Sequence, residues 1–407
     1  MRIAGIIVEY NPMHNGHVYH INKTKELTGC DYVVAVMSGN FNQRGIPSIV
    51  DKWTKTKMAL LNGVDIVLEL PCVYSLSSAE FFSSGAVSLL NSLGIIDSIC
   101  FGSESGDIKL LDNISEVLTN EPVEFKELLK NHLDTGITFP KARSLALNEY
   151  LESHSLWTHE DLEIQLNSSN NILGIEYLKS LKKYKSSIKP YTLHREGGSY
   201  NSQTINKASF SSATSIRAAI KNHHGFKSIA DHVPQSVLEE LIRLDSMNYV
   251  FADESMIYPY IKYKNSIEDK NSLELLPDVS EGLHNKISSS ILNSQDYEQC
   301  INLIKSKRYA YTRISRILCQ YYLGLDNYNL DAMRRTPCPY ARLLGFNQRG
   351  TELLKHIKNN SSVPLYSKLP KDKPPILEVD LLATRGYSIL NPFIRHNEDL
   401  LTSPLRV

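Results

Sequence analysis

The stretch VEYNPMHNGHVYH, residues 8–20, decides the fold of this chain. It overlaps the end of the apolar run RIAGIIVEY, which has the length and composition of a strand, and runs into a segment with helical spacing at 16–28. Two histidines, His14 and His17, enclose Asn15 and Gly16 at the junction. A strand, a short turn and a helix in this order predict that the turn lies at the carboxyl edge of a parallel sheet, where ligands bind.

Apolar runs of strand length alternate with helical segments along the first hundred residues. The further expected strands are 32–39, 65–71 and 97–104, and the expected helices are 16–28, 51–62 and 78–93. This alternation predicts a parallel sheet with right-handed crossovers. Because strands that are apolar throughout belong in the middle of such a sheet, we expect the first strand to be central.

Beyond residue 105 the sequence becomes more polar and keeps a helical period. The expected helices there are 107–118, 123–134, 140–153 and 171–184, followed by a strand at 187–196 and a helix start at 211–220. We therefore predict a Rossmann-like α/β domain over residues 1–225, with a helical insertion at about 105–185. Residues 226–407 are expected to form a mainly helical C-terminal region with a small mixed α/β part.

Composition limits the classes of protein that the chain can belong to. Lysine plus arginine and aspartate plus glutamate both number 44, so no field of the whole protein attracts nucleic acid, and any RNA site must be a local basic patch. Six cysteines without CxxC spacing indicate reduced thiols in the cytosol. No signal peptide and no apolar stretch of roughly 20 residues are evident, so we expect a soluble, cytoplasmic protein with no membrane partner.

The turn at 14–17 has the chemistry of a phosphate site. His14 and His17 can donate hydrogen bonds to phosphate oxygens, most strongly when charged. Gly16 permits close approach, and the free N–H groups at the start of the following helix attract anions. The alternative is an ordinary turn with two surface histidines. A metal pair is a third reading, but no third ligand lies nearby in the sequence, and we predict no metal site here.

A second element, FSSATSIR at 210–217, has similar chemistry. Ser211, Ser212 and Thr214 supply hydroxyl groups and a helix cap, and Arg217 could stabilise the charge of a departing pyrophosphate. A plain capped helix with a solvated arginine is the alternative. Two such elements at opposite ends of one α/β domain favour the phosphate site.

Together, HNGH at 14–17 and SSATSIR at 211–217 resemble the motifs of the HIGH-motif nucleotidyltransferase superfamily. More closely, the chain resembles the bacterial tRNA(Met) cytidine acetate ligase family in GIIVEYNPMHNGHVYH, in residues 38–71, in FGSE at 101–104, in 167–181 and in LHREGGSY at 193–200. This resemblance implies ATP and Mg²⁺ as cofactors, and acetate and elongator tRNA(Met) as substrates. Members activate acetate as acetyladenylate and acetylate N4 of the wobble cytidine, which gives N4-acetylcytidine.

The resemblance also implies site residues. His14, His17 and Arg217 correspond to the catalytic groups. The expected ATP contacts are Ile7, Val8, Glu9, Tyr10, Asn11, Pro12, Met13, His14, Asn15, Gly16, His17, Val18, Tyr19, His20, Gly102, Asn170, Arg195, Ser212, Thr214 and Arg217. Taken without the resemblance, Gly102 reads equally as a strand-end turn, Asn170 as a helix cap and Arg195 as a surface charge.

Two further stretches carry candidate substrate contacts. KSKRYAYTRISRIL at 305–318 contains no acidic residue, and on a helix Lys305, Arg308 and Arg316 share one face with Thr312. We expect Lys305, Arg308, Arg313 and Arg316 to contact tRNA phosphates there, although a solvated helix face is the simpler reading. The loop NFNQRG at 40–45 could bring Asn40, Gln43 or Arg44 to acetate or tRNA, or serve structure alone.

Two other functions fit the same residues. The protein could be a nucleotidyltransferase that adenylylates a small phosphorylated metabolite, or an RNA-binding scaffold without catalysis. Those transferases are commonly much shorter, so the long C-terminal region favours a macromolecular substrate. Intact His14, Gly16, His17 and Arg217 speak against a scaffold.

Overall fold

The computed structural model describes residues 1–137, 139–154, 156, 166, 168–195, 211–221, 226–280, 282–306 and 308–407. One mixed sheet is built from β1 (Ile3–Val8), β2 (Tyr32–Ser38), β5 (Ile66–Leu70), β6 (Ser98–Ser103), β7 (Lys189–His194), β8 (Ala341–Phe346), β9 (Leu365–Tyr366) and β10 (Leu405–Arg406). The strand order is β10-β8-β5-β2-β1-β6-β7, with β9 beside β8. Pairs from β5 to β7 are parallel, as predicted, and β1 lies inside the sheet.

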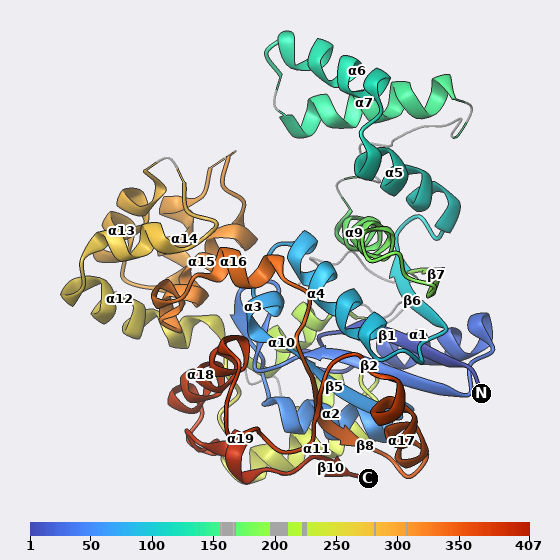
Figure 1. The fold of residues 1–407 in the computed structure, drawn as a ribbon. Helices are drawn as coiled ribbons and strands as arrows, with labels where there is room; N and C mark the ends of the chain where they lie inside the picture. Colours follow the sequence, from blue (N-terminus) through green and yellow to red (C-terminus); the bar gives the residue numbers. More distant parts are fainter. Residues whose placement is uncertain are drawn as a thin grey trace.

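Helices cover both faces of this sheet (Figure 1). Successive residues of β2 alternate between two hydrophobic cores, because neighbouring strand side chains point to opposite faces. Val33 and Ala35 pack with α1 (Asn15–Thr28), α2 (Lys52–Leu61), α10 (Ala213–Lys221) and α11 (Gln235–Ser246). Val34 and Val36 belong to the other core with α4 (Ala79–Ser92) and α9 (Ser169–Lys183). The helices and strands predicted in residues 1–105 are confirmed to within two residues at their ends.

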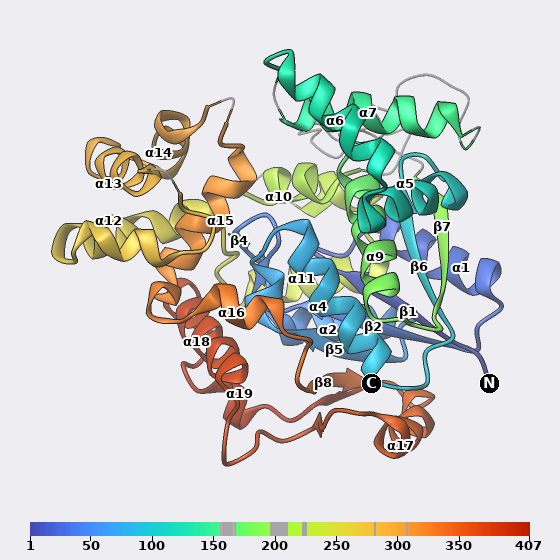
Figure 2. The ribbon, with the colours of Figure 1, turned by 45° about the horizontal axis from the view of Figure 1, so that its top comes forward.

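The predicted insertion is confirmed as a helical segment between β6 and β7. It contains α5 (Ile108–Asn120), α6 (Val123–Asp134), α7 (Phe139–Ser153) and α9. Helices α6 and α7 form a hairpin that projects away from the sheet in both ribbon views (Figures 1 and 2). Within the part of the chain that the structure describes, no helix is long and apolar enough to cross a membrane.

The C-terminal part begins with a helical group beside the sheet (Figure 1). It contains α12 (Tyr258–Ile267), α13 (Leu283–Asn293), α14 (Tyr297–Ile304), α15 (Tyr311–Tyr322) and α16 (Leu330–Arg335). Short 3₁₀ helices lie at η1 (Phe226–Ile229), η2 (Glu254–Ile257), η3 (Lys270–Leu275) and η4 (Leu325–Asn327), and α3 (Cys72–Ser75) packs on α16 and on α18 (Pro375–Leu390). The mainly helical character predicted for the C-terminal region is confirmed over residues 226–335.

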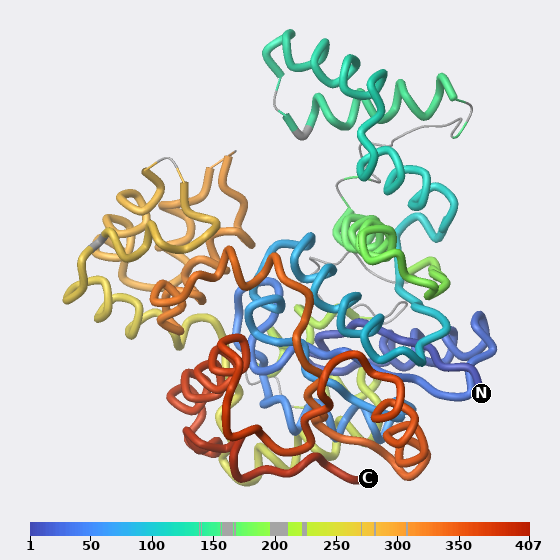
Figure 3. The backbone as a smooth tube through the Cα atoms, viewed as in Figure 1, coloured from blue at the N-terminus to red at the C-terminus, as the bar shows by residue number. Residues whose placement is uncertain are grey.

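The end of the chain returns to the sheet formed by its first hundred residues (Figure 3). Strand β8 pairs antiparallel with β5, and β10 pairs parallel with β8. Helices α17 (Gly350–Asn360), α18 and α19 (Glu398–Leu401) accompany these strands. The small mixed α/β part expected in this region therefore extends the main sheet, and the division at residue 225 stays a prediction.

A buried group of four charges joins the two ends of the chain. The Lys52 Nζ lies 2.7 Å from Glu69 Oε1 and 2.7 Å from Asp399 Oδ1. Arg342 adds contacts of 3.0 Å to Glu69 and 2.7 Å to Asp399. These residues come from α2, β5, β8 and α19, so the group holds β8 and α19 against the α/β core. Buried charges are tolerated when each has an opposite partner in this way.

Candidate active site

Two adjoining cavities open at the carboxyl ends of β1 and β6. We call the larger, of about 260 Å³, the large chamber, and the smaller, of about 70 Å³, the small chamber. Both are lined by Glu9, His14, His17, Arg195 and Ser212. The large chamber also has an apolar wall formed by Ile7, Phe82, Phe101, Leu173, Tyr177 and Leu193. The small chamber also takes residues Tyr10, Asn11, Asn42, Arg44, Ile46, Ala213, Thr214 and Arg217.

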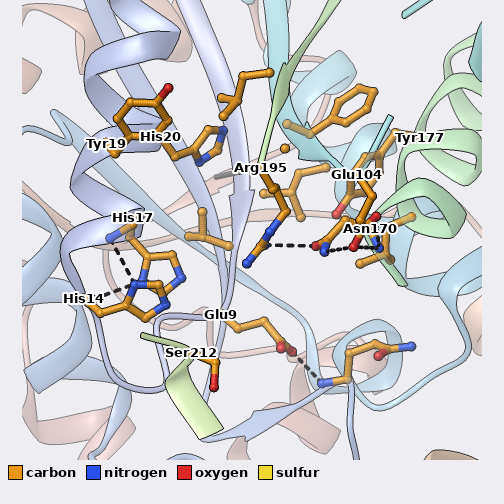
Figure 4. A pocket seen from close by; sticks show the side chains of 18 of the residues that line it. Glu9, His14, His17, Tyr19, His20, Glu104, Asn170, Tyr177, Arg195 and Ser212 are labelled. Carbon is orange, nitrogen blue, oxygen red and sulfur yellow. Dashed lines mark hydrogen bonds between the residues drawn. The ribbon is translucent and has the colours of Figure 1, made fainter. Parts of the chain in front are cut away.

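The two histidines of the HNGH turn cap helix α1 with their own rings. His14 is the N-cap, and its Nδ1 accepts a hydrogen bond from the Gly16 N–H at 3.1 Å. The His17 Nδ1 accepts from the His14 N–H at 3.2 Å, and the two rings stack with centroids 3.7 Å apart (Figure 4). An Nδ1 atom that accepts leaves the proton on Nε2, so each neutral ring presents an Nε2–H donor.

The backbone N–H groups at the start of α1 are not free, in contrast to the expectation from sequence. The Asn15 N–H donates to the His232 carbonyl at 3.0 Å, and the His17 N–H donates to the His14 carbonyl at 2.8 Å. The Gly16 N–H is held by His14. Because these backbone donors are already bound within the protein, the turn presents its imidazole rings to a ligand.

The histidines are also neutral at physiological pH, in contrast to the charged donors considered from sequence. Burial, together with the cations of Arg195 and Arg217, lowers the pKa of His14 to about 3. Burial and His14 lower the pKa of His17 well below its usual value. Burial lowers the pKa of His20, whose Nε2 lies 3.1 Å from the Cys100 carbonyl, to about 4. Positive charge at the chambers therefore comes from arginine.

Helix α10 brings the SSATSIR element against the HNGH turn. The Ser212 Oγ accepts from the Ser215 N–H at 3.1 Å and caps the helix. Arg217 Nη1 donates to the Asn11 carbonyl at 2.7 Å, and its Nη2 donates to Thr214 Oγ1 at 3.2 Å. The two motifs, distant in sequence, thus share the small chamber, and the reading of Arg217 as a solvated surface arginine is wrong.

The three other expected ATP contacts meet in the large chamber. Arg195 Nη1 donates to Asn170 Oδ1 at 3.2 Å (Figure 4). Gly102 lies inside β6, where a Cβ would come within 3.0 Å of Arg195 Cγ, so the missing side chain makes room for that arginine. Sequence reasoning missed Glu104, whose carboxylate accepts from the Asn170 Nδ2 at 2.6 Å and from the Asn171 N–H at 2.9 Å. Its place in FGSE, two residues after Gly102, was the available signal.

Not every residue of the expected ATP segment faces a chamber. Pro12, Met13, Asn15 and Val18 do not line either cavity. Met13 is fully buried in the core, and the Asn15 side chain donates to the Asp231 carbonyl at 2.9 Å. Met13 belongs to the hydrophobic core on this face of the sheet, and Val18 packs against the same core, so their side chains are not available to the chambers. Apart from Ile7, sequence reasoning also missed the apolar wall, whose residues come from the five elements β1, α4, β6, α9 and β7.

The predicted tRNA contacts do not form one exposed helix face. Helix α15 begins only at Tyr311, so Lys305 and Arg308 lie before it and are exposed. Arg313 is half-buried and donates to the Asp278 carbonyl at 2.7 Å. Arg316 is only 7% exposed and lies 3.8 Å from the Asp278 carboxylate, so its placement on an exposed basic face is wrong. An acidic residue distant in sequence draws it inward.

A sheet of this topology, with the two motifs at one edge, defines a HIGH-type nucleotidyltransferase. The family model described as HIGH Nucleotidyl Transferase matches residues 1–400. The tRNA(Met) cytidine acetate ligase of Clostridium kluyveri is 54% identical over 405 residues, covering 100% of this chain and 99% of that protein. The tRNA(Met) cytidine acetate ligase of Clostridium novyi (strain NT) is 53% identical, with 100% and 99% covered.

Solved structures agree with these sequence matches. The apo crystal structure of Thermotoga maritima TmcAL superposes with a TM-score of 0.92 at 30% identity, and 100% of both chains is covered. The same protein bound with alpha-thio ATP gives a TM-score of 0.88 at 30% identity, again over 100% of both chains. The chain belongs to the tRNA(Met) cytidine acetate ligase family, which confirms the resemblance drawn from its motifs.

Proposed function

We propose that the protein activates acetate with ATP and transfers the acetyl group to N4 of the wobble cytidine of elongator tRNA(Met). One observation carries this proposal: an apolar-walled chamber and an arginine-lined chamber meet at His14, His17 and Glu9. The first suits a nucleoside, and the second suits the charged phosphates of ATP. A triphosphate that spans both chambers has its α-phosphorus beside the two imidazole donors.

The chemistry then follows from position and charge. An acetate oxygen attacks the α-phosphorus, the bond to the β-phosphate oxygen breaks, and pyrophosphate leaves. The Nε2–H groups of His14 and His17 donate to the phosphoryl oxygens, and Arg217 balances the charge of the pyrophosphate. The cytidine amine next attacks the acetyl carbonyl, AMP leaves, and the amine loses a proton. The chain's own residues orient the reactants and stabilise the charge that develops on the phosphates. No covalent intermediate on the protein is needed.

The carboxylate of Glu9 is the group in the two chambers that suits Mg²⁺. In the part of the chain that the structure describes, no group of three or more His, Cys, Asp or Glu side chains gathers to hold a metal. Glu9 lines both chambers, and its Oε1 accepts from the Gln43 N–H at 2.6 Å. Mg²⁺ commonly binds through one or two carboxylates with phosphate oxygens and water, so Glu9 is the residue that would help to hold it. The ion would neutralise phosphate charge.

For the acceptor, we propose that the exposed basic turn before α15 meets tRNA phosphates. Lys305 and Arg308 are exposed there, and Arg313 follows at the start of the helix. These contacts would position the RNA without reading its bases. A substrate of this kind agrees with a cytoplasmic location.

The test is ATP–pyrophosphate exchange with Mg²⁺, comparing acetate, formate, propionate and no acid, followed by mass spectrometry of N4-acetylcytidine in tRNA(Met). Exchange that requires acetate, and acetylation that requires both acetate and tRNA, are the expected results. No exchange with any acid, with or without tRNA, would contradict the proposal. Exchange supported by a phosphorylated metabolite instead would favour the metabolite adenylyltransferase, and tRNA binding without exchange would favour the scaffold.

A further inference from the structure

The hairpin formed by β3 (Phe41–Asn42) and β4 (Ile46–Pro47) places its turn between the two chambers. Gln43 lines the large chamber and Arg44 lines the small chamber, where Arg217 and Thr214 also lie. The Gln43 N–H donates to the Glu9 carboxylate at 2.6 Å, which ties the turn to the end of β1. Asn40, by contrast, is buried and accepts from the Lys52 N–H at 2.9 Å, so its role is structural.

The other side of this turn rests on helix α15 of the C-terminal part. Gly45 has a φ of +77°, and a Cβ there would come within 2.2 Å of the Arg316 backbone nitrogen. The Ser315 Oγ donates to the Gly45 carbonyl at 2.9 Å, and Arg316 Nη1 donates to the Gln43 carbonyl at 3.4 Å. The turn is thus held on one side by helix α15 and on the other side by the Glu9 carboxylate.

Arg44 is one of the sources of positive charge at the small chamber. Since His14 and His17 are neutral, the positive charge around the small chamber is supplied by the guanidinium groups of Arg44, Arg195 and Arg217. Burial raises the pKa of Tyr311, the first residue of α15, to about 12, while the cations of Arg44 and Arg217 oppose that rise. The positive charges of Arg44 and Arg217 therefore both lie close enough to the start of α15 to affect the pKa of Tyr311.

We propose that Arg44 contacts the departing pyrophosphate of ATP in the small chamber, and that α15 holds it there through Gly45 and Arg316. This inference rests on the proposed function. It makes the C-terminal helices part of the adenylation site, so they act before any tRNA binds. Arg44 is then a catalytic residue, and Arg316 is a positioning residue that acts through the Gln43 carbonyl.

The test uses the full-length protein and ATP–pyrophosphate exchange with acetate. Arg44→Met keeps the alkyl stem and removes the charge, so exchange should fall about 100-fold with a raised KM for pyrophosphate and ATP. The KM for acetate and the affinity for tRNA(Met) should stay within about twofold, since loss of one donor at the phosphates leaves those contacts intact. The control is Arg385→Met, an exposed arginine of α18, which should behave as wild type.

A second pair of variants tests the support from α15. Arg316→Met should lower exchange about tenfold, and Arg316→Lys should restore part of it, because lysine keeps one donor and the charge opposite Asp278. Thermal unfolding of both variants separates lost support from lost folding. Exchange by Arg44→Met within twofold of wild type, or a defect confined to the acetate KM or to acetyl transfer, would overturn the proposal. Absence of acetate-dependent exchange in the wild type would instead refute the proposed function.

Discussion

The carboxylate of Glu104 holds both the backbone N–H and the side-chain amide of Asn170, at 3.1 and 2.6 Å. The same carboxylate accepts the Asn171 N–H, so it caps the start of α9 and fixes the amide that receives Arg195. Through three donors at the start of one helix, the Glu104 carboxylate therefore fixes the orientation of Asn170 and, through it, of Arg195 at the wall of the large chamber.

Glu104→Gln should raise the KM for ATP about tenfold, because one of the two accepting oxygens becomes a donor and Asn170 loses its fixed orientation. The value of kcat should change little, since the proposed position of the α-phosphorus is nearer to the histidines than to Glu104. Steady-state exchange kinetics measure both constants. Glu127→Gln, at an exposed position of α6, is the matched control. A lowered kcat at an unchanged KM would show that Glu104 acts on the chemical step.

His17→Asn should lower exchange by about 10²–10³-fold, since the Asn oxygen can still accept the His14 N–H while the Nε2–H donor is lost. His17→Ala removes the cap as well and should also lower the free energy of unfolding by about 1 kcal/mol. Exchange assays and chemical denaturation of the two variants distinguish the loss of the Nε2–H donor from the loss of the helix cap. If either variant kept undiminished exchange, the assignment of His17 to the phosphoryl group would fail.

Protonation of His20 should destabilise the protein in mild acid. Its folded pKa, about 4, lies below the ordinary value of 6.5 because of burial, so the unfolded chain binds the extra proton first. The stabilising contribution is complete above pH 6.5 and is lost as the pH falls toward 4. His20→Asn should therefore reduce the fall in unfolding free energy between pH 7.5 and 5 by about 2 kcal/mol. Urea titrations at both pH values measure this. The exposed His356→Asn should leave the fall unchanged, and an equal fall in both variants would show that His20 does not carry the effect.

Asp399→Asn should lower the free energy of unfolding by about 3 kcal/mol, because Lys52 and Arg342 would lose one of their two buried carboxylate partners. At temperatures where the variant stays folded, the KM for ATP should match wild type, since Asp399 lines neither chamber. Thermal unfolding and exchange kinetics are the two measurements. Asp372→Asn, at an exposed position, serves as the control. A loss below 1 kcal/mol would mean that water or rearrangement replaces the lost contact.

Periodicity located the elements of the first hundred residues well because β1, β2 and β5 are buried along almost their whole length and stand out as apolar runs between helical segments. The same local reasoning identified HNGH and SSATSIR, and it placed HNGH at the carboxyl edge of the sheet. That the two motifs meet there, with Arg217 donating to the Asn11 carbonyl, is a finding of the structure.

Contacts between segments that are distant in sequence could not be predicted from local sequence patterns. Nothing in the spacing of 305–318 indicates that Asp278 draws Arg316 inward, or that Gly45 lies against its backbone. Nothing near residue 341 indicates an antiparallel partner at β5. The tautomers of His14 and His17 also depend on backbone N–H groups whose positions only the folded turn defines.

The pairing of β8 with β5 has a consequence for synthesis on the ribosome. Residues Ile66–Leu70 emerge early and form one side of the nascent sheet, but their partner Ala341–Phe346 emerges only after most of the chain has been made. Until then β5 has an open edge, which is where chains pair wrongly and aggregate. Such distant contacts also slow folding. Truncation before Ala341 would make the exposed edge permanent, so the nucleotide-binding part depends on the late arrival of β8.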